Sequence, residues 1–126
     1  MIQGDNAVDA HITVWTARGR LTFPEIRDKM IDFSSGIMKS RVLCDLTRAT
    51  VADLTTREIE EIIKLIGRKV NGAHGARSAI VVHGGVDYGL ARMFSTFSEL
   101  AGLPVKVKVF RTAEVAREWL SSRDEL

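Results

Sequence analysis

The sequence contains a single cysteine, Cys44, and only two prolines in 126 residues. One cysteine excludes an internal disulfide and a cysteine-rich zinc site. A free thiol inside an apolar run is typical of the reducing cytoplasm, so we predict a cytoplasmic protein. The longest uninterrupted apolar run is Ala79-Ile80-Val81-Val82, far shorter than the ~20 residues of a transmembrane helix. Residues 1–10 also lack the basic-then-apolar pattern of a secretory signal.

Aromatic residues make up 6% of the chain. The net charge is small, because 18 basic residues stand against 16 acidic ones. The basic residues form no continuous block, and no aromatic residues interleave with their densest cluster. A nucleic-acid platform needs both features, so we expect no nucleic-acid partner. The remaining composition, 45% hydrophobic and 27% charged, is that of a globular protein. The length predicts a single domain over residues 1–126.

Four short runs rich in Val and Ile predict β-strands, at residues 11–17, 41–46, 79–83 and 105–110. The third run has no polar face, which indicates a strand covered on both sides. In the last run, Val105, Val107 and Val109 alternate with lysines, which indicates an edge strand with one face in water. A homodimer formed through that edge is compatible with the pattern but not required by it.

Helical stripes of apolar residues separate and follow these runs, and their spacing indicates core positions. Two helix starts carry the capping-box spacing, Thr22 with Glu25 and Thr55 with Glu58. The order of elements is a strand followed by a helix, four times. Such an order predicts an α/β fold, a (βα)4 right-handed superhelix with a mostly parallel sheet of four or five strands.

Ligands of open parallel sheets gather outside the carboxyl ends of the strands. The polar residues near those ends include Asp45, Arg48, His83, Asp87 and Arg111. If the strands are neighbours, Asp45, His83 and Arg111 share one rim.

Motifs for cofactors and metals are missing from the sequence. We interpret Gly84-Gly85 as a tight turn, because the glycine spacing there is not GxGxxG, and no GxxxxGK[ST] motif exists. The three histidines show no metal-ligand spacing. We therefore predict no cofactor and no metal.

Two stretches of the sequence together form a recognisable signature. The first is Gly19-Arg20-Leu21-Thr22, before the first predicted helix. The second is a longer ending that runs from the third predicted helix into the last one: Gly89-Leu90-Ala91-Arg92-Met93-Phe94, then 107–111, then Glu114, Ala116, Trp119 and Leu120. Both stretches resemble the bacterial SpoIIAA-like group of the STAS superfamily, and the resemblance implies a mostly parallel β/α fold. STAS domains bind partners, sometimes nucleotides or lipids, and most perform no chemistry.

In the anti-sigma-factor antagonists of that superfamily, a strand ends in Asp, and eight residues later an Asp-Ser-Ser-Gly motif contains a phosphorylated serine. Here Asp45 and Asp53 have this separation, and Asp53-Leu54-Thr55-Thr56 stands at the motif. Leu54 and Thr56 depart from the pattern. The resemblance makes Thr55 and Thr56 candidate phosphoacceptors, whereas a plain helix cap at Thr55 is the alternative. Arg92 belongs to the shared signature, and a structural ion pair is its simplest role.

We therefore predict a non-enzymatic STAS-like regulatory module that docks a protein partner at the start of the second helix, gated by phosphorylation there. One alternative is a small-molecule or lipid-binding domain, with the ligand beneath the apolar third helix. A second alternative is an enzyme that uses Asp45, His83 and Arg111. The candidate partner-binding or ligand-binding residues are Asp45, Arg48, Asp53, His83, Asp87, Arg92 and Arg111.

Overall fold

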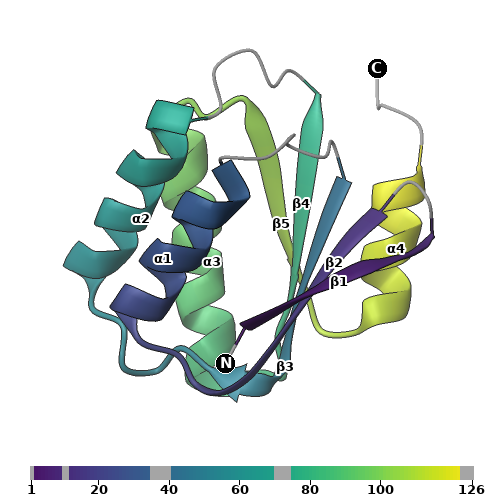
Figure 1. The fold of residues 1–126 in the computed structure, drawn as a ribbon, viewed down its shortest axis with the longest axis horizontal. Helices are drawn as coiled ribbons and strands as arrows, with labels where there is room; N and C mark the ends of the chain where they lie inside the picture. Colours follow the sequence, from purple (N-terminus) through teal and green to yellow (C-terminus); the bar gives the residue numbers. More distant parts are fainter. Residues whose placement is uncertain (1, 10–11, 35–40, 70–74, 123–126) are drawn as a thin grey trace.

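The computed structural model describes residues 2–9, 12–34, 41–69 and 75–122. Within these ranges the chain forms five strands and four helices (Figure 1). In chain order they are β1 (Ile2–Asp9), β2 (Ile12–Arg20), α1 (Phe23–Ser34), β3 (Arg41–Thr50), α2 (Thr56–Lys69), β4 (Ala76–Val81), α3 (Gly85–Leu100), β5 (Val105–Phe110) and α4 (Ala113–Ser121).

The described strands form one sheet in the order β1-β2-β3-β4-β5. Strands β2 to β5 are parallel to one another, which confirms the predicted α/β fold. β1 is antiparallel to β2 and was not among the predicted strands. Its sequence, IQGDNAVD, has no apolar alternation, so its strand conformation comes from backbone pairing with β2 and not from a local pattern.

The predicted third and last runs behave in the sheet as expected. β4 is buried along almost its whole length, and β5 forms one edge of the sheet with alternating half-buried and exposed residues. β4 nevertheless spans Ala76–Val81 and not 79–83. β3 continues past residue 46 to Thr50, because Ala49 and Thr50 pair with Gly19 and Arg20 of β2. Backbone hydrogen bonds extend these strands through residues whose side chains give no strand signal.

Helices cover both faces of the sheet, three on one side and one on the other within the described residues. Figure 1 shows α1, α2 and α3 on one face and α4 on the opposite face. The α4 face holds a dense core of residues from β2, β3, β4 and α4: Ile12, Val14, Leu43, Ala79, Val81, Ala116, Trp119 and Leu120. None of the helices in the described ranges has the length and apolar character to cross a membrane.

Two arginines hold the carboxyl end of α4 against the sheet. The buried Arg77 on β4 donates from Nη1 to the Trp119 carbonyl at 2.6 Å and to the Ser122 carbonyl at 3.1 Å. Arg41, its neighbour on β3, donates from Nε to the Leu120 carbonyl at 3.0 Å. These carbonyls belong to the last turn of the helix, where the helix dipole is negative. The two cations therefore satisfy the hydrogen-bonding capacity of these carbonyls and offset the negative end of the α4 dipole.

We expect Arg77→Met to lower the free energy of unfolding by about 2–3 kcal/mol, because it leaves buried helix carbonyls without charged donors. Urea unfolding would measure the change. Lys106→Met is the matched control, since Lys106 lies opposite Arg77 on β5 and is exposed. The control should change stability by less than about 0.5 kcal/mol. Equal effects of the two substitutions would contradict the anchoring role of Arg77.

Candidate functional site

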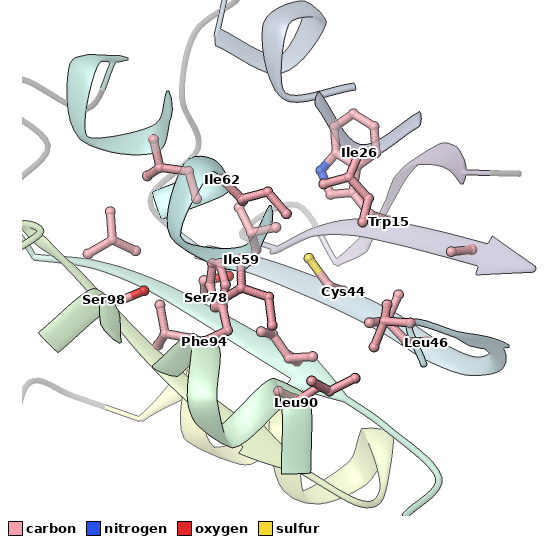
Figure 2. Close-up of a pocket in the computed structure, with 18 of the residues that line it drawn as sticks. Trp15, Ile26, Cys44, Leu46, Ile59, Ile62, Ser78, Leu90, Phe94 and Ser98 are labelled. Atoms are coloured by element: carbon pink, nitrogen blue, oxygen red, sulfur yellow. The ribbon is translucent and has the colours of Figure 1, made fainter. Parts of the chain in front are cut away.

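A cavity of about 220 Å³ lies between the sheet and the layer formed by α1, α2 and α3. Figure 2 shows side chains from the strands and the helices converging on it. Nearly all of the lining is apolar. Its residues include Trp15, Ile26, Cys44, Leu46, Leu54, Ile59, Ile62, Ile66, Ile80, Leu90, Phe94 and Val107.

The strand period and the helix period together produce this lining. Side chains alternate between the two faces of a strand, so Val42, Cys44 and Leu46 face the cavity while Leu43 enters the core under α4. On α2, Ile59, Ile62 and Ile66 recur at helical spacing and turn the same way. α2 packs chiefly on α1 and α3, so its apolar face covers the cavity instead of resting directly on the strands.

The uncharged polar groups of the lining are small and few: Cys44, Ser78 and Ser98. Burial raises the pKa of the Cys44 thiol to about 11, opposed only by a hydrogen bond with Ser78. The thiol is therefore protonated at neutral pH, as expected for a cysteine that serves as packing. Ser98 on α3 is 2% exposed, and its Oγ has no hydrogen-bond partner in the described part of the chain. The sequence signal for Ser98 is a hydroxyl on the same helical face as Ala91 and Phe94, which the sequence analysis missed.

Lys29 and Trp15 bound the cavity on the side of α1. Lys29 Nζ lies 4.6 Å from the centroid of the Trp15 ring, and both side chains are half-buried. This cation–π contact holds the ammonium group over the aromatic face. Figure 2 places Trp15 and Ser98 on opposite sides of the pocket. The cationic group therefore lies far from the Ser98 hydroxyl.

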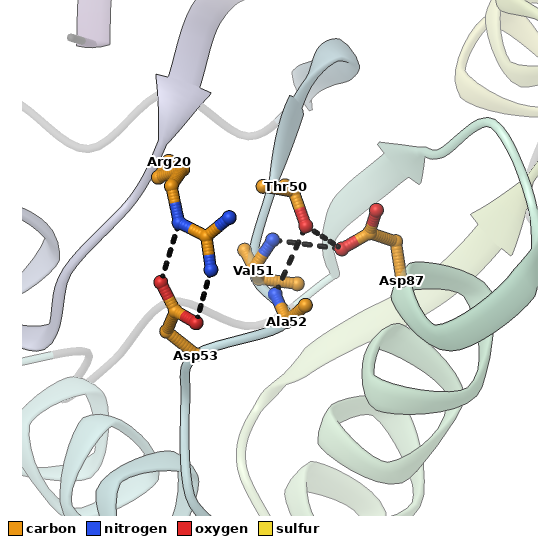
Figure 3. A network of polar contacts seen from close by, with 6 residues as sticks. All are labelled: Arg20, Thr50, Val51, Ala52, Asp53 and Asp87. Carbon is orange, nitrogen blue, oxygen red and sulfur yellow. Dashed lines mark hydrogen bonds and ion pairs between the residues drawn. The ribbon is translucent and has the colours of Figure 1, made fainter.

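A polar network joins the ends of β2 and β3 to the starts of α2 and α3 (Figure 3). Arg20 donates to both carboxylate oxygens of Asp53, at 2.9 and 2.6 Å. The hydrogen bond from Arg20 lowers the pKa of Asp53 below its ordinary value. Asp87 Oδ1 accepts from the Val51 amide at 2.7 Å and from Thr50 Oγ1 at 3.0 Å. These contacts give Asp53 and Asp87 a positioning role in the fold.

Thr55 forms the predicted capping box at the start of α2. Its Oγ1 accepts from the Glu58 amide at 3.1 Å, and its own amide donates to Glu58 Oε1 at 2.9 Å. Thr56, the first residue of α2, is exposed, and its Oγ1 lies 3.9 Å from Met93 Sδ. The two candidate phosphoacceptors thus differ, because the hydroxyl of Thr55 is engaged in the cap.

The proposed rim of Asp45, His83 and Arg111 is divided between the two faces of the sheet. Asp45 lies within β3 and, like Phe110 of β5, opposite Val81, so it is level with the ends of β4 and β5, which His83 and Arg111 follow. Asp45 shares the α4 face with Leu43, and its Oδ1 accepts from the Thr47 amide and hydroxyl. Arg111 instead stacks on α3, which covers the other face. Strand alternation separates side chains that the backbone brings together.

Arg111 and Arg92 both approach the phenol of Tyr88 on α3. The Arg111 guanidinium carbon lies 4.6 Å from the ring centroid. A hydrogen bond from Arg92, with the charges of both arginines, lowers the pKa of Tyr88. Arg92 thus has a phenol as partner, where the sequence suggested an ion pair.

Two further candidate residues, His83 and Arg48, are exposed, and Arg48 lies opposite Arg18 on β2. In the described part of the chain, no group of three or more His, Cys, Asp or Glu side chains is placed to hold a metal ion.

The raised pKa of Cys44 predicts a loss of stability in alkali. Its contribution is fully present below pH 9.0, the ordinary thiol pKa, and is lost as the pH rises toward about 11, because the unfolded chain ionises first. We expect the free energy of unfolding to fall by about 2 kcal/mol more between pH 8 and 10.5 in the native protein than in Cys44→Ala. Urea unfolding at the two pH values measures this, and identical pH slopes would contradict the burial of the thiol.

Neither a family model nor a curated protein matches the chain. Among solved structures, it is similar to the crystal structure of an uncharacterized protein from the DUF3478 family with a SpoIIAA-like fold, from Shewanella loihica PV-4. The sequences are 23% identical, the TM-score is 0.59, and the match covers 95% of this chain and 92% of that chain. The fold implied by the sequence resemblance is therefore confirmed: this chain has a SpoIIAA-like fold.

Proposed function

We propose that this chain is a STAS-like module that binds a small apolar molecule in the cavity under α1, α2 and α3. The observation that carries the proposal is the cavity itself, about 220 Å³ with an almost wholly apolar lining. Apolar pockets with a few polar groups are the usual form of small-molecule sites. This was the alternative function in the sequence analysis, which placed the ligand beneath the third helix, α3.

The lining favours an organic occupant over water. A buried water requires two to four polar partners, and apolar cavities of ~150 Å³ stay dry and accept benzene. A cavity half as large again fits a ligand of about eight to ten non-hydrogen atoms. At about −0.7 kcal/mol per atom, such a ligand binds with a free energy of roughly −6 kcal/mol, or a Kd near 0.1 mM.

We expect p-xylene to bind the full chain with a Kd on the order of 0.1 mM in isothermal titration calorimetry. Ala91→Leu should weaken p-xylene binding at least tenfold, because Ala91 lines the cavity and is buried on α3. The larger side chain takes the place of part of the ligand, so the ligand loses apolar contacts. The free energy of unfolding of that variant should equal or exceed that of the native protein, since the new side chain fills empty space.

Ala52→Leu is the control for this experiment, because Ala52 is exposed in the loop before α2. It should leave p-xylene binding unchanged. Absence of p-xylene binding to the native protein, or equal binding to Ala91→Leu and the native protein, would remove the cavity as a ligand site.

A second candidate function is docking of a protein partner at the start of α2, as a non-enzymatic regulatory module gated by phosphorylation. The exposure of Asp53, Thr55 and Thr56 at this helix start supports it. A phosphate at a helix N-terminus is stabilised by the helix dipole. Thr56 is the better acceptor, because a phosphate on Thr55 displaces the cap and adds charge beside the Glu58 carboxylate.

Under this second function, protein isolated from its native cells should carry phosphate on Thr56 and not on Thr55. Tandem mass spectrometry of the peptide that spans Asp53 to Glu58 distinguishes the two sites. In the purified chain, Thr55→Ala should lower the free energy of unfolding by about 1 kcal/mol through loss of the cap, and Thr56→Ala by less than about 0.5 kcal/mol. A peptide free of phosphate under all growth conditions would argue against gating.

A further inference from the structure

The Ser98 hydroxyl is a buried polar group that the fold leaves without a hydrogen bond. Ser98 lies on α3, is 2% exposed, lines the cavity, and its Oγ has no partner among the described residues. Figure 2 shows the hydroxyl at one side of the pocket, beyond Phe94. A serine in a helix usually satisfies its hydroxyl on the carbonyl four residues earlier or in water. Ser98 Oγ has no carbonyl partner of this kind among the described residues, so it is available to a group inside the cavity.

An apolar residue at this position would suit the empty cavity better. Leu90, Ala91 and Phe94 occupy the same face of α3 and are all apolar. A buried hydroxyl without a partner destabilises the folded state, whereas the same hydroxyl bonded to a ligand does not. The serine therefore points to an occupant with a polar atom at this place.

The charged groups near the cavity exclude an ionised ligand group beside Ser98. The charged residues of the described lining are Lys29 and Arg77. The Arg77 guanidinium is engaged with the end of α4 on the opposite face, and Lys29 lies over Trp15 across the pocket. Ser78, which also lines the cavity, is paired with the neutral Cys44 thiol. A carboxylate or phosphate placed near Ser98 would be buried without a counter-charge, at high cost in free energy.

We propose that Ser98 selects the ligand of this cavity. The ligand class is a small neutral molecule with an apolar body and one hydroxyl or carbonyl group, and the Ser98 hydroxyl donates to or accepts from that group. This inference rests on the proposed binding function and adds its specificity. A hydroxyl offers one donor and two acceptor sites, so Ser98 can bond to an alcohol, a phenol or a ketone. The remaining lining contacts the apolar part of the ligand.

The test compares p-cresol with p-xylene, two molecules of the same shape in which a hydroxyl replaces a methyl group. Both are titrated by calorimetry at pH 7 into the native chain, Ser98→Ala and Ser78→Ala. Ser98→Ala should weaken p-cresol binding about tenfold and change p-xylene binding less than about twofold, because only p-cresol loses a hydrogen bond. Ser78→Ala is the matched control, since its hydroxyl is already paired. It should preserve the ratio of the two affinities.

The outcomes separate this inference from the function on which it rests. Binding of p-xylene with an unchanged p-cresol affinity in Ser98→Ala overturns the role of Ser98 and leaves the apolar site standing. Failure of both compounds to bind the native chain overturns the site and the role together. Urea unfolding adds a second readout: Ser98→Ala should match or exceed the native stability without ligand. A loss of stability would show a structural role for the hydroxyl and would also overturn the inference.

Discussion

The cavity depends on how the three-helix layer is anchored over the sheet. At the carboxyl ends of the strands, Asp87 at the start of α3 accepts hydrogen bonds from Thr50 and Val51 at the end of β3. Farther along α3, Ser95 Oγ donates to the Val107 carbonyl of β5 at 2.8 Å. These bonds fix α3 to two strands, while α2 packs on α1 and α3. The layer is thus tied to the sheet at defined points, and the apolar cavity lies between the layer and the sheet.

The two faces of the sheet differ in how closely their side chains are packed. Under α4, branched aliphatic residues and Trp119 pack into a dense core, and arginines from β3 and β4 satisfy the end of the helix. Close packing of this kind contributes to the stability of the fold. The opposite face also holds a buried cluster, with Ile80, Val82 and Ala91, but the cavity leaves part of that face without packing contacts. A fold that is firm on one face tolerates an open cavity on the other, which is the arrangement that a small-molecule site needs.

The carboxyl edge, where ligand chemistry was expected, is largely committed to holding the fold. Asp53, Asp87 and Asp45 each accept hydrogen bonds from neighbouring backbone or side chains. Arg111 and Arg92 gather around Tyr88 and not around a carboxylate. Asp87 holds the start of α3 to the end of β3, and we place the proposed binding function in the apolar space beneath α2 and α3. The SpoIIAA-like neighbour shares the fold over nearly the whole chain, which places the layer and the sheet in a known architecture.

Local patterns in the sequence determined the strands with apolar runs, the helices with apolar stripes, the capping boxes, and the parallel order that follows from alternation. The edge position of β5 was readable because Lys106 and Lys108 alternate with valines. The tertiary structure alone decided the rest. β1 has no apolar period and exists through pairing with β2. The separation of Asp45 from Arg111 depends on which face each strand residue occupies, and the isolation of Ser98 depends on the gap between two layers. Periodicity reports which side chains are buried, but burial against a neighbour and burial against an empty space leave the same pattern in a sequence.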